Sequence, residues 1–224
     1  MKILEINELK IPEIKTIKFA RFHDHRGYFT EQFRKSDLFN RSELNSMKGI
    51  NFVQANQSYS KKGTIRGMHF QWNPYMGKMV RTLSGHMVDL ILDIRKGSPN
   101  YGKMIAYEMQ ESDVKEYDEW IWVPQGFAHG NFFIEDSKIE YMCSGEYNSN
   151  CESGISPLAK DINWSLCDKK LKNKFDRISN LTKLITDKDK DGFSLEKWSN
   201  DERSNNFIYE KLKEKSYRLV ENQK

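Results

Sequence analysis

A histidine with other polar residues at alternate positions is the clearest chemical signal in this sequence. His69 lies two residues after Gly67 and two before Gln71. In a β-strand, residues two apart share a face, so these three point one way and Met68 and Phe70 the other. A lone strand histidine is usually a packing or surface residue. An imidazole in a polar row is suited to act as a general base near neutral pH.

Two further segments carry polar side chains in a comparable arrangement. Gln54, Asn56 and Ser58 occupy alternate positions upstream, and His129 follows a Pro-x-Gly turn downstream. Several strands that each carry a polar row predict an interior that holds a polar ligand rather than a dry core. Tyr141, in a mostly apolar stretch, is a candidate general acid, although a strand tyrosine is often only a packing residue.

Metal chemistry fits the pattern less well than proton transfer. Metal-binding cupins use a His-x-His pair with a glutamate and a later histidine, and Gln71 stands where the second histidine would be. The Asp-x-Asp-x-Asp-Gly run at 187–192 resembles half of a calcium loop, but Trp198 occupies the twelfth position, which requires a glutamate. We therefore expect no metal, and Lys78 and Arg66 are the candidates to stabilise an anion.

Composition indicates a soluble cytoplasmic protein. The 224 residues include three cysteines, an odd number without metal-binding spacing, which favours a reducing compartment. No stretch approaches the roughly 18 apolar residues of a membrane span. The net charge of +4 comes from residues 165–224, which carry 15 Lys and Arg against 11 Asp and Glu, whereas residues 1–164 carry 21 of each. Because these charges alternate in sign, they favour a solvated helical face over a nucleic-acid or membrane surface.

Short strands separated by turn signals are predicted through the first two thirds of the chain. Their spacing is typical of a mainly β sandwich or jelly roll. We predict strands at residues 15–21, 28–34, 50–58, 64–71, 78–84, 86–94, 103–109, 119–123, 130–134 and 138–146. A short helix is predicted from Ser36 to Ser46, with Ser36 as its N-cap.

The character of the sequence changes after Trp164. Residues 165–183 are rich in lysine and asparagine, and residues 205–221 carry an imperfect helical stripe of apolar residues. This segment has too few apolar residues to form a core of its own. We therefore predict one jelly-roll domain over residues 1–164 and a largely helical extension over residues 165–224 that packs on or beside it.

Several motifs occur in the order found in one enzyme family. They are D-x-R-G-x-F-x-E at residues 24–31, Q-x-N-x-S-x-S at 54–60, R-G-M-H-F-Q at 66–71 and P-x-G-F-A-H-G at 124–130. On these motifs the chain resembles the dTDP-4-dehydrorhamnose 3,5-epimerases, the cupin-fold epimerases of nucleotide-linked 4-keto-6-deoxy sugars. The resemblance covers residues from about 5 to 164, with a short further match near residues 184–190, and it implies a cupin-type jelly-roll barrel.

The resemblance implies a role for each matching residue. His69 would be the catalytic base, Asp189 would orient it, Tyr141 would be the acid, and Lys78 would hold the developing enolate. The residues implied to contact the substrate are Arg26, Glu31, Gln54, Asn56, Ser58, Arg66, Gln71, His129, Glu152 and Lys188.

The segment implied to supply Asp189 departs from the family pattern. Its connection from Trp164 is longer than is usual for the family and lacks the usual proline-rich character. This departure leaves Asp161 as an alternative partner for His69.

The implied reaction is epimerisation at C3, C5 or both of a nucleotide-diphosphate 4-keto-6-deoxy sugar, in deoxysugar and cell-surface polysaccharide biosynthesis. A ketone at C4 acidifies the protons on C3 and C5, so the resemblance implies no cofactor. Alternatives are a single-centre 3-epimerase, a ketoisomerase of the same family, or a sugar-binding cupin without activity. Family members pair through N-terminal strands, so the resemblance also implies a homodimer formed through residues 1–20.

Overall fold

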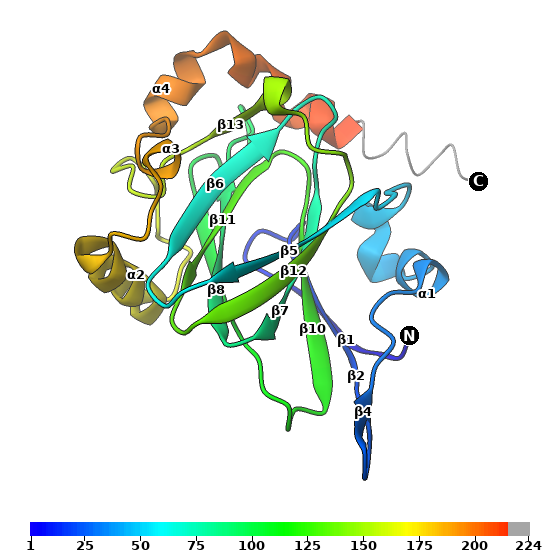
Figure 1. The fold of residues 1–224 in the computed structure, drawn as a ribbon. Helices are drawn as coiled ribbons and strands as arrows, with labels where there is room; N and C mark the ends of the chain where they lie inside the picture. Colours follow the sequence, from blue (N-terminus) through cyan, green and yellow to red (C-terminus); the bar gives the residue numbers. More distant parts are fainter. Residues whose placement is uncertain (215–224) are drawn as a thin grey trace.

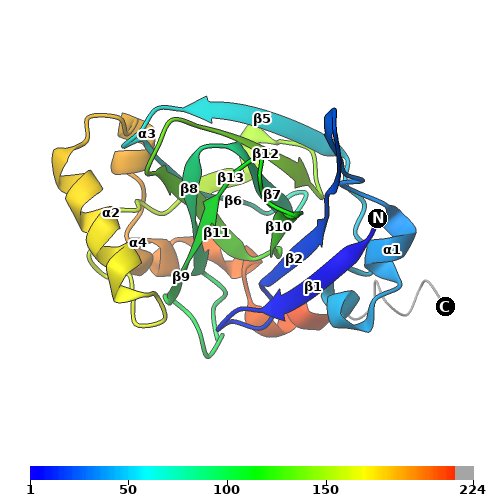
Figure 2. The same ribbon diagram turned by 90° about the horizontal axis from the view of Figure 1, so that it is seen from below.

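Two antiparallel sheets packed face to face form the centre of the molecule, a computed structural model that describes residues 1–214 (Figures 1 and 2). The six-stranded sheet has the order β1 (Ile3–Glu8), β2 (Lys15–Ala20), β10 (Tyr117–Val123), β7 (Lys78–Ser84), β12 (Ser137–Cys143) and β5 (Gln54–Ser60). The five-stranded sheet has the order β13 (Glu152–Gly154), β6 (Ile65–Gln71), β11 (Phe127–Phe133), β8 (His86–Asp93) and β9 (Met104–Gln110). The predicted mainly β jelly roll is confirmed, although within the described residues the strands form separate sheets rather than one closed barrel.

Strand β8 shows how the sequence pattern produces two cores. Val88 and Leu90 point out of the five-stranded sheet into an outer core, whereas Met87 and Ile91 point into the central core between the sheets. A strand that is buried on both faces has a nearly continuous apolar sequence, and residues 87–94 follow this pattern. Asp89 shares the inward face with Met87 and Ile91, so this carboxylate is buried between the sheets.

The C-terminal extension covers the outer face of the five-stranded sheet (Figure 1). It contains α2 (Lys169–Leu181), α3 (Asp187–Lys190), α4 (Leu195–Asn200) and the 3-10 helix η3 (Glu202–Asn206). Asp168 caps α2, because its side chain accepts a hydrogen bond from the backbone N–H of Lys170. Within the stripe predicted over 205–221, residues 205–206 end η3 and residues 209–214 are helical, whereas residues 215–221 lie outside the described residues.

Aromatic side chains join the extension to strand β6. The ring of Phe70 lies 4.7 Å from the ring of Trp198 and 5.2 Å from that of Phe207, measured between centroids. Trp198 and Phe207 are both fully buried. The extension and the jelly roll therefore share one apolar core, and the strand that carries His69 is part of it.

The N-terminal third differs most from the sequence-based expectation. The predicted strand 28–34 is wrong beyond residue 29, where a hairpin of β3 (Phe22–Asp24) and β4 (Gly27–Phe29) ends. The prediction of a single helix over residues 36–46 is also wrong. This segment divides into α1 (Lys35–Phe39) and a 3-10 helix (Ser42–Met47), because Arg41 adopts an extended backbone, and no side chain caps α1.

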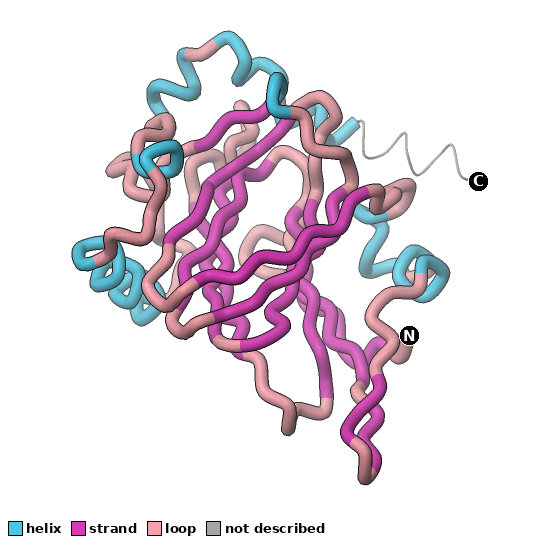
Figure 3. Tube along the Cα trace, in the orientation of Figure 1, coloured by secondary structure: helices cyan, strands magenta, loops and turns pink. Residues whose placement is uncertain are grey.

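Two corrections move elements relative to the predicted site. The strand predicted at 130–134 starts earlier, at Phe127, so His129 lies on β11 and not in the preceding turn. The strand predicted at 50–58 is shifted along the chain and covers Gln54–Ser60. Elsewhere, a short 3-10 helix (Ser149–Cys151) precedes β13. Tube colouring shows the resulting arrangement of strands at the centre and helices at the periphery (Figure 3). No helix among residues 1–214 is long and apolar enough to cross a membrane.

Removing the Trp198 ring is expected to destabilise the whole domain. Trp198→Ala leaves a cavity against Phe70 in the outer core, so the free energy of unfolding is expected to fall by about 3–5 kcal/mol in urea titrations. Leu181→Ala, at a side chain that is 79% exposed near the end of α2, is the matched control and is expected to change stability little. An equally small effect of both variants would contradict a shared core.

Candidate active site

His69 and Asp189 form a hydrogen-bonded pair at the inner edge of the five-stranded sheet. The Nε2 atom of His69 lies 2.7 Å from Oδ1 of Asp189. Burial acts to raise the pKa of Asp189, but the hydrogen bond and charge interaction with His69, together with hydrogen bonds from Gly67 and Thr186, outweigh it, so this pKa is lowered. The ionised carboxylate therefore accepts the Nε2 proton, which leaves Nδ1 of His69 as the proton acceptor. The His69 side chain is 36% exposed and is accessible to a ligand.

The position of Asp189 depends on a short helix in the extension. Thr186 caps α3, and its side chain accepts a hydrogen bond from the backbone N–H of Asp189. Asp161, the alternative partner, instead accepts the backbone N–H of Glu196 at the start of α4, with a distance of 2.9 Å. The structure thus pairs His69 with Asp189.

His69 faces the space between the sheets. It lies directly opposite His129 in the antiparallel pair of β6 and β11, and opposite residues share a face. His129 alternates with Phe127 and Phe133, which both belong to the central core. The imidazoles of both histidines are therefore directed towards the six-stranded sheet.

His129 forms a second pair with a buried carboxylate. Its Nε2 lies 2.8 Å from Oδ1 of Asp89, and both side chains are buried. Burial lowers the pKa of His129, and the nearby charges of Lys78 and His69 act in the same direction. His129 is therefore neutral near pH 7 and donates its Nε2 proton to Asp89.

Tyr141 faces the two histidines from the opposite sheet. It lies on β12 between Asn56 of β5 and Val80 of β7, and its ring packs against the central core. Burial raises the pKa of the Tyr141 phenol, although a hydrogen bond with Asn56 acts against this shift. The phenol is thus protonated at neutral pH and can donate a proton.

Lys78 enters the same space beside Cys143, its backbone partner on β12. Burial lowers the pKa of Lys78, and the charges of Asp89 and Glu152 act in the opposite direction. Asp89 and Glu152 belong to the five-stranded sheet, so Lys78 is electrostatically coupled to groups on both sheets. No residue in the described part of the chain accepts a hydrogen bond from its ammonium group.

Charged and polar side chains line the entrance next to His69. A cavity of about 280 Å³ is lined by residues that include His69, Glu152, Lys188 and Asp189. Lys188 pairs with Oε1 of Glu152, and the Tyr147 hydroxyl donates to the same oxygen at 2.9 Å. The hydrogen bonds with Lys188 and Tyr147 overcome the effect of burial, so the pKa of Glu152 is lowered. The entrance therefore carries an ionised carboxylate and an ammonium group side by side.

Strand β5 contributes a polar row next to Tyr141. Gln54, Asn56 and Ser58 are all half-buried, and they alternate with the exposed Ala55 and Gln57. The Gln54 amide donates to Oδ1 of Asn56 at 3.1 Å, and its Oε1 accepts the backbone N–H of Tyr147 at 2.8 Å. On the neighbouring strand β6, the Arg66 guanidinium donates to Ser60 Oγ at 2.8 Å.

The hydrogen-bonding groups of the Gln71 side chain are already satisfied within the protein. Its Nε2 donates to the backbone oxygens of Pro74 and Glu146, at 2.8 and 2.9 Å, and its Oε1 accepts the backbone N–H of Asn148 at 2.8 Å. The side chain is buried, so it joins two loops. The expected direct contact of Gln71 with a substrate is therefore not supported.

Arg26 and Glu31 lie away from His69 within one chain. Arg26 sits at the tip of the β3–β4 hairpin, which projects from the opposite end of the sheets in both ribbon views (Figures 1 and 2). Its guanidinium pairs with Asp24 at 2.6 Å, and Glu31 pairs with Arg34 at 2.6 Å. A single chain thus does not bring these two residues to the site.

Sequence reasoning missed three residues of the site. Asp89 had a signal, because it shares an inward strand face, but its pairing with His129 depends on the sheet register. Tyr147 carried no signal beyond its residue type, whereas Thr186 lies within the short family match near residues 184–190 but was given no role. In residues 1–214, no three His, Cys, Asp or Glu side chains are grouped so that they could hold a metal ion.

Comparison with known proteins gives a consistent result. Residues 8–197 match the family model described as dTDP-4-dehydrorhamnose 3,5-epimerase. The enzyme of that name from Sinorhizobium fredii is 37% identical over 161 residues, which span 70% of this chain and 78% of that enzyme. The structure of the rmlC epimerase of Mycobacterium tuberculosis superimposes with a TM-score of 0.77 at 26% identity, over 99% of this chain and 100% of that one.

A third similar protein was solved with a sugar nucleotide. The RmlC epimerase of Legionella pneumophila, in complex with dTDP-4-keto-L-rhamnose, superimposes with a TM-score of 0.68 at 28% identity. The match covers 86% of this chain and 93% of that one.

The buried neutral His129 is expected to make stability depend on pH. Because its folded pKa is lowered, the unfolded chain takes up a proton that the folded protein resists, and stability falls as the pH drops below about 6.5. In His129→Gln the amide still donates towards Asp89 but does not titrate, so urea unfolding between about pH 7 and pH 5 is expected to show a shallower fall. His25→Gln, at an exposed hairpin position, is the control, and equal slopes for all three proteins would refute the effect.

Proposed function

Since the chain belongs to the dTDP-4-dehydrorhamnose 3,5-epimerase family, we propose that it inverts C3, C5 or both in a dTDP-linked 4-keto-6-deoxy sugar. It is an isomerase of deoxysugar biosynthesis. The observation that carries the proposal is the space between the sheets, which the His69–Asp189 pair enters from one side and Tyr141 with Lys78 from the other. A proton can therefore be removed from one face of a sugar ring and returned to the other.

Proton removal falls to His69. The C4 ketone lets the charge left at C3 or C5 spread onto oxygen, so a base of moderate strength suffices. The Asp189 carboxylate holds Nε2–H, which directs the basic Nδ1 at the substrate and stabilises the imidazolium that forms. The proton moves from carbon to Nδ1, and the electron pair moves into the enolate.

Lys78 stabilises the enolate oxygen. Lys78 is half-buried, desolvation lowers its pKa, and no hydrogen-bond acceptor among the described residues contacts its ammonium group. Charge attraction is much stronger in such a low-dielectric space than in water. A developing oxyanion is therefore the partner that Lys78 lacks in the free protein, and preorganised stabilisation of this kind is usually the largest contribution to catalysis.

Tyr141 returns a proton to the opposite face of the ring. Burial keeps its phenol protonated, and Asn56 bonds to it from the neighbouring strand. A proton added from the six-stranded sheet, after removal towards the five-stranded sheet, inverts the carbon. A sugar-binding protein without activity would have no need for an acid and a base on facing walls.

The charged entrance suits the diphosphate and nucleoside of the substrate. Lys188 lines this cavity, and we propose that Arg66 on β6 also contacts the diphosphate. We assign Gln54, Asn56, Ser58 and Glu152 to substrate binding with them, and His129 to the wall of the sugar pocket.

A homodimer would bring Arg26 and Glu31 to a second copy's entrance. The hairpin that carries Arg26 exposes apolar rings, and Phe29 at its end is 68% exposed. Its base is rigid, because the Tyr28 ring lies 4.2 Å from the Arg21 guanidinium, which donates to Asp118 at 2.8 Å. A rigid arm with a cationic tip and an exposed apolar ring at its base suits insertion into a partner. We place this enzyme in the cytoplasm.

Hydrogen exchange at the sugar tests the reaction. With a dTDP-4-keto-6-deoxy sugar in heavy water, deuterium is expected to enter C3, C5 or both while the carbonyl remains at C4. His69→Ala is expected to abolish exchange, and Asp189→Asn to slow it about 10²-fold or more. Asp161→Asn is the matched control with unchanged exchange. A carbonyl that moves would indicate a ketoisomerase, and wild-type protein without exchange would refute the proposal.

A charge on the hairpin tests the dimer. Phe29→Asp is expected to shift the protein to monomers in sedimentation and to raise KM, because an apolar contact would have to bury a carboxylate. Val114→Asp, at a loop residue that is 85% exposed, is the control and is expected to leave both unchanged. If Phe29→Asp stays dimeric with an unchanged KM, the hairpin does not complete a partner's site.

A further inference from the structure

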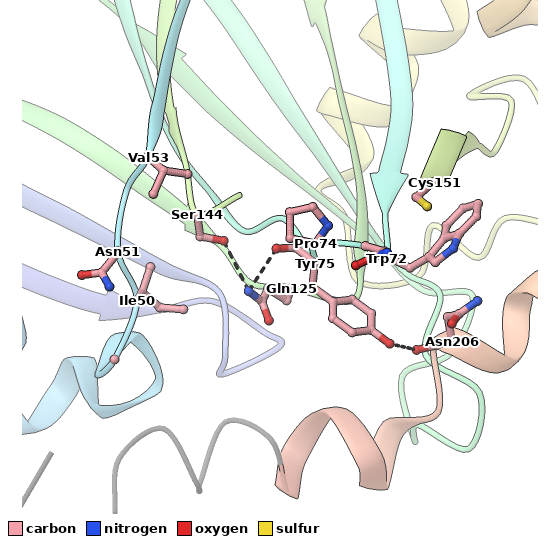
Figure 4. A pocket seen from close by; sticks show the side chains of 12 residues that line it. Ile50, Asn51, Val53, Trp72, Pro74, Tyr75, Gln125, Ser144, Cys151 and Asn206 are labelled. Atoms are coloured by element: carbon pink, nitrogen blue, oxygen red, sulfur yellow. Dashed lines mark hydrogen bonds between the residues drawn. The ribbon is translucent and has the colours of Figure 1, made fainter. Parts of the chain in front are cut away.

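A second cavity lies at the strand ends, outside the space between His69 and Tyr141. Its volume is about 870 Å³, against about 280 Å³ for the cavity beside His69 (Figure 4). Its walls come from the segment before β5, the β6–β7 loop, the turn before β11, the residue after β12, the 3-10 helix before β13 and the end of η3. These six segments are separate in the sequence and converge only in the folded chain.

The lining of this cavity carries no charged side chain. Its polar members are the amides and hydroxyl of Asn51, Asn73, Gln125, Ser144 and Asn206. A Lys35 ammonium group binds Asn51 at 3.2 Å without itself lining the cavity. The cavity beside His69 contains Glu152, Lys188 and Asp189 instead. A neutral lining offers no partner to a diphosphate, so the ligand that fits here is uncharged.

Several polar atoms in the lining have unused bonding capacity. Gln125 Nε2 donates to the Tyr75 carbonyl at 3.2 Å and to Ser144 Oγ at 3.3 Å, so the amide is held in one orientation. Its Oε1 has no partner within residues 1–214 and is directed away from both bonds in Figure 4. Asn206 Nδ2 donates to the Arg203 carbonyl, which leaves its Oδ1 as a second acceptor among the described residues.

Two aromatic rings complete the cavity. Trp72 and Tyr75 flank the cis-proline turn of the β6–β7 loop, and both rings pack nearly perpendicular to Phe207, with centroids 6.4 and 5.9 Å away. The Tyr75 hydroxyl donates to the Asn206 carbonyl at 2.6 Å. The rings are therefore fixed before any ligand arrives, which lowers the entropy cost of binding.

We propose that this cavity is a binding site for a neutral sugar, separate from the epimerase centre. Rigid aromatic rings suit the apolar C–H face of a sugar ring, and oriented amide groups suit its hydroxyls. The site also adjoins the catalytic strands, because the Gly77 N–H donates to Ser144 Oγ at 2.7 Å, next to Lys78 and Cys143.

The test uses the full chain with its epimerase centre saturated with dTDP. Methyl α-L-rhamnoside and methyl α-D-glucoside are titrated separately in saturation-transfer NMR experiments. At least one is expected to bind with a dissociation constant on the order of 1–10 mM, with excess dTDP present. His69→Ala is expected to bind equally well. Trp72→Leu and the milder Asn73→Ala are each expected to weaken binding about tenfold or more, while circular dichroism reports on their folding.

Any one of three results would refute the proposed site. The first is that neither glycoside binds at concentrations on the order of 50 mM. The second is that dTDP displaces the bound glycoside, and the third is that the affinity is unchanged in both folded variants. Displacement by dTDP would place the glycoside in the epimerase centre instead. The measurement is independent of turnover, so a protein that fails to exchange deuterium can still pass it.

Discussion

The hydrogen bond between His69 and Asp189 links the jelly roll to its C-terminal extension. The two residues are 120 positions apart, and their contact requires α3 to rest against the edge of β6. That placement depends in turn on the apolar face of β6, where Phe70 packs on Trp198 and Phe207. One strand thus supplies an inward imidazole and an outward anchor for the segment that orients it. The alternation of side chains in a strand makes both possible at adjacent residues.

Burial between the sheets shifts three groups in a consistent way. It lowers the pKa of His129 and of Lys78 and raises that of Tyr141, so burial acts against the charged form of each group. Asp189 is also buried, but its interactions with His69, together with hydrogen bonds from Gly67 and Thr186, outweigh burial and preserve its charge. The interior is thus a weakly solvating space in which a transient anion would be strongly attracted to a nearby cation. Enolate chemistry benefits from this environment.

The two cavities differ in their chemistry as well as their place. Charged groups such as Lys188 and Glu152 surround the entrance beside His69, whereas amides and aromatic rings line the larger cavity at the strand ends. The former suits a sugar nucleotide, and the latter an uncharged ring. The hairpin with Arg26 and Phe29 adds a third surface, which one chain leaves unpartnered within the described residues.

Local sequence determined much of this protein. The alternation in residues 54–60 and 65–71 was enough to predict which faces of β5 and β6 are polar, because a strand has a fixed period of two. The order of the motifs identified the family and named His69, Tyr141 and Lys78 as candidates. Tertiary structure decided the partner of His69, because the short match near residues 184–190 pointed to Asp189 while the unusual connection before it left Asp161 as an alternative. In the folded chain Gln71 forms hydrogen bonds with two loops, and Arg26 lies away from the site. These outcomes depend on distant segments meeting in space, which a local pattern does not encode.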